Sequence, residues 1–160
     1  MNTNVGNRTV SALDLLKQHE RAIERLYTAY AARFPQEREF WLGLSQEEEG
    51  HARCLESLEQ RIGEDPESLI VDRFPTAAIE HSLTYVGKLI DQAGHPSLTR
   101  VKALSAAMDV ERALLENKYL EVFSSDSAAL RRTLELLDRA TRVHFEKIHQ
   151  LWENAARPQA

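Results

Sequence analysis

Apolar residues recur at every third or fourth position along most of this chain, and the few glycines and prolines gather in short clusters between these stretches. That spacing is the period of an amphipathic α-helix, whose apolar face packs into a core. We therefore expect an all-α protein. A chain of 160 residues can bury a sizeable core without disulfides or structural metal ions, so a single domain over residues 1–160 is expected.

The clusters divide the chain into four long helices and one shorter helix. Ser11, with Asp14 three residues later, resembles a capping box that begins the first helix, and Phe34-Pro35 ends it. Gly63 is predicted to end the second long helix in the left-handed conformation, and Ser97 is predicted to be the N-cap of the third long helix. The predicted helices cover residues 11–33, 36–62, 76–93, 97–123 and 128–155.

The connections between the four long helices are short, long and short. The long connection, residues 63–96, contains an extended-looking stretch at 69–71 and the shorter helix. It allows the helix over 97–123 to run parallel to the helix over 36–62, as in four-helix bundles that have one long crossover. The sequence therefore predicts a bundle of this kind.

Composition excludes several classes of partner. A net charge of −5 gives no basic surface for nucleic acid or for an anionic membrane. No apolar run approaches the ~20 residues that span a bilayer, and the first residues lack the hydrophobic region of a signal peptide, so a soluble cytoplasmic protein is expected. The single cysteine, Cys54, excludes an internal disulfide and a Cys-x-x-Cys metal site, and it is predicted to be a partly buried thiol beside Leu55.

The inward face of each long helix is apolar except near its middle, where polar residues interrupt it. A buried polar side chain needs a compensating hydrogen bond, charge or metal ion. Counting residues from the hairpin turns puts the interruptions at similar heights, within about 5 Å at a rise of 1.5 Å per residue. The interrupting residues are Glu20, Glu48, His51, Glu111, Thr141 and His144.

Three carboxylates at one level of a core are costly without positive charge, and no lysine or arginine lies on the four inward faces at that level. A metal cation is the simplest compensation. Carboxylate oxygens and imidazole nitrogens suit iron or manganese, and also zinc. Because Glu48 and His51 are three residues apart on one helical face, they can bind the same ion.

These residues resemble the ferritin-like superfamily and, within it, the rubrerythrin-like proteins. Residues 44–58 are similar to the second helix of that family, residues 103–111 to its third, and Glu20 followed by Tyr27 to its first. Its di-iron centres take a glutamate from each of two helices and a Glu-x-x-His pair from each of the others. The resemblance implies an iron-dependent oxidoreductase acting on peroxide or dioxygen, a homodimer and an external electron donor. The metal ligands that it implies are Glu20, Glu48, His51, Glu111 and His144.

The chain departs from the family pattern at three points. Thr141 stands where the fourth helix should carry a glutamate, so the site lacks one carboxylate and a second metal ion is expected to bind more weakly. Met108 stands where rubrerythrins often have a further carboxylate, and one cysteine cannot supply their rubredoxin segment. A literal Glu-x-x-His, Glu146 to His149, is the alternative to His144. This pair is expected on a solvated face, because it lies about 10 Å along the bundle axis from the height of Glu111.

Other polar residues have plainer interpretations. Tyr27 and Tyr119 are predicted to be core residues whose hydroxyls bond to the site carboxylates. The residues predicted to be ordinary or solvated are His19, His81, His95, Glu47, Glu49 and Glu116. The alternative function is a non-catalytic structural or interaction bundle whose metal site has decayed, a hypothesis that Thr141 supports.

Overall fold

The computed structural model describes residues 3–64, 76–116 and 128–158. These residues form five α-helices and one short 3-10 helix, and no strand occurs among them, so the prediction of an all-α protein is confirmed. The elements are α1 (Thr3–Arg33), η1 (Pro35–Glu37), α2 (Arg38–Glu64), α3 (Thr76–Gln92), α4 (Arg100–Glu116) and α5 (Ala128–Ala156).

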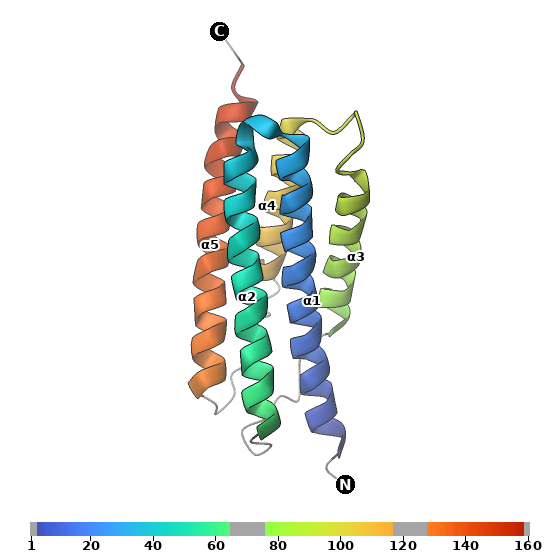
Figure 1. Cartoon of the computed structure of the whole chain (residues 1–160), viewed down its shortest axis with the longest axis vertical. Coiled ribbons are helices and arrows are strands. Elements are labelled where there is room, and N and C mark those ends of the chain that lie inside the picture. The colour runs from blue at the N-terminus through green and yellow to red at the C-terminus, as the bar shows by residue number, and fades with distance from the viewer. Residues whose placement is uncertain (1–2, 65–75, 117–127, 159–160) are drawn as a thin grey trace.

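The helices lie side by side along one long axis (Figure 1). α1 and α2 form an antiparallel hairpin joined by η1, α4 and α5 form a second antiparallel pair, and α2 packs against α5. α3 packs along α1 on the side away from α5. α4 begins at the end of the molecule where η1 lies, so it runs in the same direction as α2. There the Arg33 guanidinium donates to the carbonyls of Pro96 and Leu98 at 3.3 Å, which ties the end of α1 to the segment that leads into α4.

In the first hairpin, α1 ends where the sequence predicted, but α1 begins earlier and α2 ends later than predicted. Phe34, with φ −121° and ψ 79°, leaves the helical conformation, and Pro35 opens η1. However, α1 begins at Thr3, so Ser11 lies inside the helix and is not a cap. Likewise, α2 continues to Glu64 and includes Gly63, which the sequence placed outside it.

The start of α4 also differs from the prediction. The helix begins at Arg100, and the Thr99 hydroxyl accepts a hydrogen bond from the Lys102 backbone N–H at 3.3 Å, so Thr99 is the capping residue. Ser97 instead lies 2.7 Å from His95 Nδ1 through its hydroxyl. Residues 69–71, Tyr119 and the remainder of the predicted helix to residue 123 lie outside the described residues.

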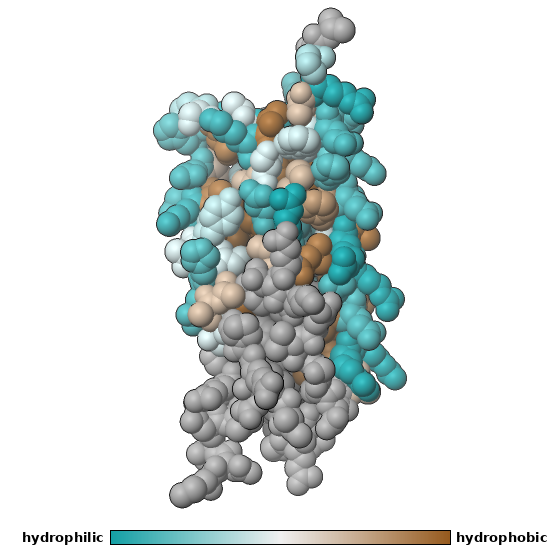
Figure 2. Space-filling model, turned by 180° about the vertical axis from the view of Figure 1, so that it is seen from behind, coloured by the Kyte–Doolittle hydropathy of each residue, from teal (hydrophilic) through white to brown (hydrophobic). Residues whose placement is uncertain are grey.

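The predicted inward faces form the core. Every apolar position predicted on α1 and α2 is buried, and Trp41 packs against Tyr27, Tyr30 and Phe40 with ring centroids 5.1–5.5 Å apart. Each such side chain contributes about 1.5–3 kcal/mol through burial. Seen from behind (Figure 2), hydrophilic side chains cover the outer sides of the described helices and apolar ones show mainly in the seams between them.

Two further features bear on what the fold can do. Cys54 is exposed, so the prediction of a partly buried thiol was wrong: the next position, Leu55, faces the core while Cys54 points to solvent. Within residues 3–64, 76–116 and 128–158, no helix combines the length and the apolar character that crossing a membrane requires.

Candidate metal centre

Four helices carry the five residues singled out by the sequence, and the structure brings all five side chains into one buried cluster. Glu20 comes from α1, Glu48 and His51 from α2, Glu111 from α4 and His144 from α5. None of them is more than 8% exposed. Their ligand atoms form two groups of three, each group with its atoms within 4.8 Å of one another. That they bind metal stays a prediction at this point.

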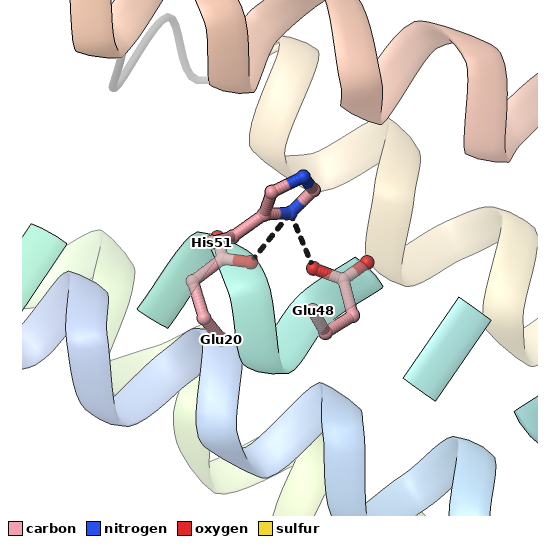
Figure 3. Close-up of side chains that lie close together, drawn as sticks. All are labelled: Glu20, Glu48 and His51. Atoms are coloured by element: carbon pink, nitrogen blue, oxygen red, sulfur yellow. Dashed lines mark hydrogen bonds and ion pairs between the residues drawn. The ribbon is translucent and has the colours of Figure 1, made fainter. Parts of the chain in front are cut away.

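The first group, called here the Glu20 triad, consists of Glu20, Glu48 and His51 (Figure 3). His51 Nδ1 lies 2.9 Å from Glu48 Oε2 and 3.5 Å from Glu20 Oε2, so one ring nitrogen faces both carboxylates. The spacing of Glu48 and His51 on α2 places both on the face toward α1. All three ligand atoms therefore come from the α1–α2 hairpin.

The second group, called here the Glu111 triad, consists of Glu48, Glu111 and His144. His144 Nδ1 lies 2.7 Å from Glu48 Oε1 and 3.6 Å from Glu111 Oε1. Glu48 thus turns one oxygen toward His51 and the other toward His144, and the two imidazole rings stack with centroids 5.4 Å apart. This is the placement of a carboxylate that bridges two adjacent sites.

Several atoms of the Glu111 triad are buried without hydrogen bonds. Tyr27 donates a hydrogen bond of 2.5 Å to Glu111 Oε1, as the sequence predicted for its hydroxyl. Glu111 Oε2 has no hydrogen-bond partner within the described part of the chain, and His144 Nδ1 meets the cluster only through its ion pairs with Glu48 and Glu111. A buried acceptor without a partner costs about 1–3 kcal/mol. A metal ion would satisfy both atoms at once.

The spacing of the donor atoms fits such an ion. Ligand atoms about 2.0–2.2 Å from one metal ion lie at most about 4.4 Å apart. The contacts of His51 Nδ1 with Glu48 and Glu20, at 2.9 and 3.5 Å, and those of His144 Nδ1 with Glu48 and Glu111, at 2.7 and 3.6 Å, fall within that distance. Oxygen and imidazole nitrogen are donors that iron, manganese and zinc accept. The residues present therefore fit a divalent metal in both triads.

Electrostatics within the cluster favour protonated histidines when no metal is bound. Burial lowers the pKa of His51, but hydrogen bonds to Glu20 and Glu48 outweigh it and raise the pKa to about 10. Burial also opposes protonation of His144, whose pKa the Glu111 and Glu48 carboxylates nevertheless raise to about 11. Burial and the Glu48 charge raise the pKa of Glu20 to about 7. Two imidazolium ions thus neutralise most of the carboxylate charge at neutral pH.

Glu47 is a further site residue, and sequence reasoning missed it. Its side chain is 46% exposed, in agreement with the prediction that it is solvated, but its Oε2 lies 2.6 Å from His144 Nε2. Lys147 donates to the other oxygen at 3.2 Å. Burial raises the pKa of Glu47, but His144 and Lys147 outweigh it and lower the pKa. A carboxylate that accepts from Nε2 fixes the imidazole so that Nδ1 faces the cluster.

Thr141 occupies the position predicted for it, on the buried face of α5 one turn before His144. Its hydroxyl donates to the Leu137 carbonyl at 2.8 Å. The side chain therefore brings no negative charge to the cluster and has already used its only hydrogen-bond donor.

The literal pair Glu146 and His149 lies elsewhere, as predicted. Glu146 is exposed, and His149 stacks between Phe145 and Trp152 with centroids 6.0 and 6.1 Å away. His149 Nε2 lies 3.8 Å from Glu153, on the outer face of α5. This pair takes no part in the buried cluster.

His19 was predicted to be ordinary, but it is fully buried. It stands next to Glu20 on α1 and faces α3, where its Nε2 lies 2.8 Å from the Ser82 hydroxyl. Burial lowers the pKa of His19, so the ring is neutral at pH 7. The histidine therefore joins α3 to α1 without adding charge, whereas His81 and His95 are exposed.

No family model, curated protein or solved structure matches this chain. The geometry of the buried cluster is therefore what points to a function.

Proposed function

We propose that the protein is a ferritin-like four-helix bundle of the rubrerythrin-like kind that binds two adjacent divalent metal ions. The single observation that carries the proposal is that the Glu20 triad and the Glu111 triad share Glu48, one carboxylate oxygen facing each histidine. Two buried atoms without hydrogen bonds, Glu111 Oε2 and His144 Nδ1, add to it.

The direction of the helices supports a ferritin-like bundle. α1 and α5 run one way and α2 and α4 the other, with α3 in the connection that leads from α2 to α4 (Figure 1). Bundles with one long crossover have this order, and they build metal sites from inward side chains at mid-height. The homodimer and the cytoplasmic location remain predictions.

Iron is the metal that we propose first, with manganese and zinc as alternatives, because the donors are three carboxylates and two imidazoles. Bound ferrous iron would supply electrons for the reduction of peroxide or dioxygen. The chain positions the ligands: Tyr27 holds Glu111 through its hydroxyl, and Glu47 orients His144. An external donor would have to return the electrons, since the one cysteine cannot form a thiolate metal site.

A non-catalytic bundle with a decayed site is the second candidate. The observation that favours it is the ion pairing of His51 with Glu48, and of His144 with Glu47 and Glu48, which compensates charge without a metal. Under this hypothesis the protein stays fully stable when no metal is present.

Metal analysis and anaerobic titration distinguish the two candidates. The chain is purified from cells grown with iron, stripped with a chelator and titrated with Fe(II) while bound metal and thermal stability are measured. We expect at least one tightly bound ion and a Tm increase on loading, since a ligand that binds only the folded state stabilises it. Absence of bound metal together with an unchanged Tm would favour the structural bundle.

A further inference from the structure

The two triads differ in the charge that they offer. Fully ionised, the cluster supplies three carboxylates, from Glu20, Glu48 and Glu111, and its two imidazoles are neutral when they bind metal. Two divalent ions bring four positive charges, so one remains uncompensated. A net charge in a site with no residue more than 8% exposed costs several kcal/mol.

The deficit lies at the Glu111 triad. In the Glu20 triad, His51 Nδ1 is hydrogen bonded to Glu48 at 2.9 Å. In the Glu111 triad, Glu111 Oε2 is buried and has no hydrogen-bond partner among the described residues, whereas His144 Nδ1 is ion paired with Glu48 Oε1 at 2.7 Å. Three protein donors leave a divalent ion with at least one open coordination position, as in catalytic metal sites.

Thr141 explains why the chain does not fill that position itself. It lies one turn before His144 on the same buried face of α5, but its side chain is neutral and shorter than that of a carboxylate residue. Its hydroxyl hydrogen is donated to the Leu137 carbonyl. The neighbouring positions on this face, Leu137 and Ile148, are apolar and buried, so they offer no further ligand.

We propose that the Glu111 triad binds its metal ion together with a small carboxylate monoanion of the formate or acetate class, which supplies the ligand and the charge that Thr141 does not. This inference rests on the proposed function and deepens it. The anion is small and singly charged because the remaining charge is one and the surrounding α5 face is apolar. Metal and anion then stabilise each other at this site by linkage.

Co(II) titration with and without formate tests the inference. Co(II) is stable in air and reports its coordination through visible absorption, so the readout is independent of activity. We expect one Co(II) ion to bind tightly regardless of formate. The affinity for the second ion should rise by about tenfold or more at saturating formate, within the usual range of coupling between ligands.

Variants at position 141 provide matched controls. Thr141→Glu supplies the missing carboxylate, so the second Co(II) should bind tightly without formate and formate should add nothing. Thr141→Val keeps the shape and lacks the charge, so it should retain the formate effect. Circular dichroism establishes that each variant folds; if Thr141→Glu does not, the formate dependence of the second Co(II) ion in the wild type still tests the inference, because its absence overturns it.

Each remaining outcome is decisive. If the affinity for the second Co(II) ion does not depend on formate and rises only with pH, hydroxide occupies the open coordination position and the inference is overturned. A formate effect that persists in Thr141→Glu overturns it as well, as does binding of a single ion at all formate concentrations. Failure to bind any Co(II) refutes the proposed function instead.

Discussion

The Glu20 triad and the Glu111 triad share one carboxylate, yet they are built differently. The Glu20 triad takes all its residues from the α1–α2 hairpin, and its histidine is hydrogen bonded within the triad. The Glu111 triad is assembled from three helices and leaves Glu111 Oε2 and His144 Nδ1 without hydrogen bonds in the described part of the chain. Under the proposed function, the neutral Thr141 on α5 in place of a carboxylate would make the two neighbouring sites unequal. The first site would then need no ligand from outside the chain, whereas the second would need the small anion that we propose.

The largest effect should come from Glu48, because both triads use it. We expect Glu48→Gln to weaken the binding of both Co(II) ions on the order of 100-fold or more, since it removes charge from each site and leaves two histidines facing an amide. A Co(II) titration measures this. Glu49→Gln, one residue along α2 and paired with exposed Arg53, is the control and should bind as wild type. Loss of only one ion in Glu48→Gln would show that Glu48 does not bridge.

Removing one histidine at a time should separate the two triads. His144→Ala should lose the second Co(II) ion while the affinity for the first changes by no more than about threefold, a small effect for a residue outside the ligand set. His51→Ala should abolish the tight site and leave only the weaker one. If both variants lose the same Co(II) affinity for the same ions, the two triads are equivalent and the proposed difference between them is wrong.

Periodicity was enough to predict which side chains are buried. The inward faces of α1, α2, α4 and α5 follow from a 3.6-residue repeat that tertiary packing enforces. The polar residues that lie buried on these faces are Glu20, Glu48, His51, Glu111, Thr141 and His144. The starts of α3 and α5 agree with the prediction, whereas the starts of α1 and α4 and the end of α2 do not. A cap contributes only about 1 kcal/mol, and the chain continues as helix before Ser11 and through Gly63.

The contacts between helices also lay beyond the sequence. Glu47 is off the inward face of α2, so its half-exposed side chain looked solvated, and only the position of α5 brings it to His144. His19 became buried because α3 packs on α1, a pairing that no local pattern encodes. The run of three glutamates from 47 to 49 was the one signal that could have pointed to Glu47.

Glu47 should affect only the second site. We expect Glu47→Gln to weaken the second Co(II) ion by about tenfold, the lower end of the range for residues that orient a metal-bound histidine, and to leave the first unchanged. The reason is that the uncharged amide oxygen of glutamine is a weaker acceptor for the Nε2–H of His144, so the imidazole whose Nδ1 faces the metal is held less firmly. Isothermal titration measures both ions separately. An equal loss at the first ion would indicate a general electrostatic effect in place of orientation.

The pH dependence of stability should distinguish the metal-free from the loaded protein. Folded-state pKa values of about 10 for His51 and about 11 for His144 exceed the ordinary value near 6.5, so their contribution to stability is complete below pH 6.5 and is lost as the pH rises toward 10–11. We expect the Tm of the metal-free protein to fall by at least about 3 °C between pH 7 and pH 9.5. The loaded protein should fall less, because metal binding has already displaced these protons. A flat profile for the metal-free protein would contradict the ion pairing.

The smallest effect compares two buried tyrosines on α1. Tyr27→Phe removes the hydrogen bond to Glu111 Oε1 and leaves that carboxylate with no hydrogen bond from the described residues, so the metal-free protein should lose about 1–2 kcal/mol of unfolding free energy. Tyr30→Phe is the matched control, because the Tyr30 hydroxyl is buried without a partner among the described residues and its removal should be neutral or slightly stabilising. Urea denaturation measures both variants. Metal should reduce the cost of Tyr27→Phe, since an ion in the Glu111 triad gives Glu111 a new partner, whereas the Tyr30→Phe value should not change. Equal costs in the two variants would show that Tyr27 contributes packing alone, and that the Glu111 triad is supported by the ion pair with His144 without help from α1.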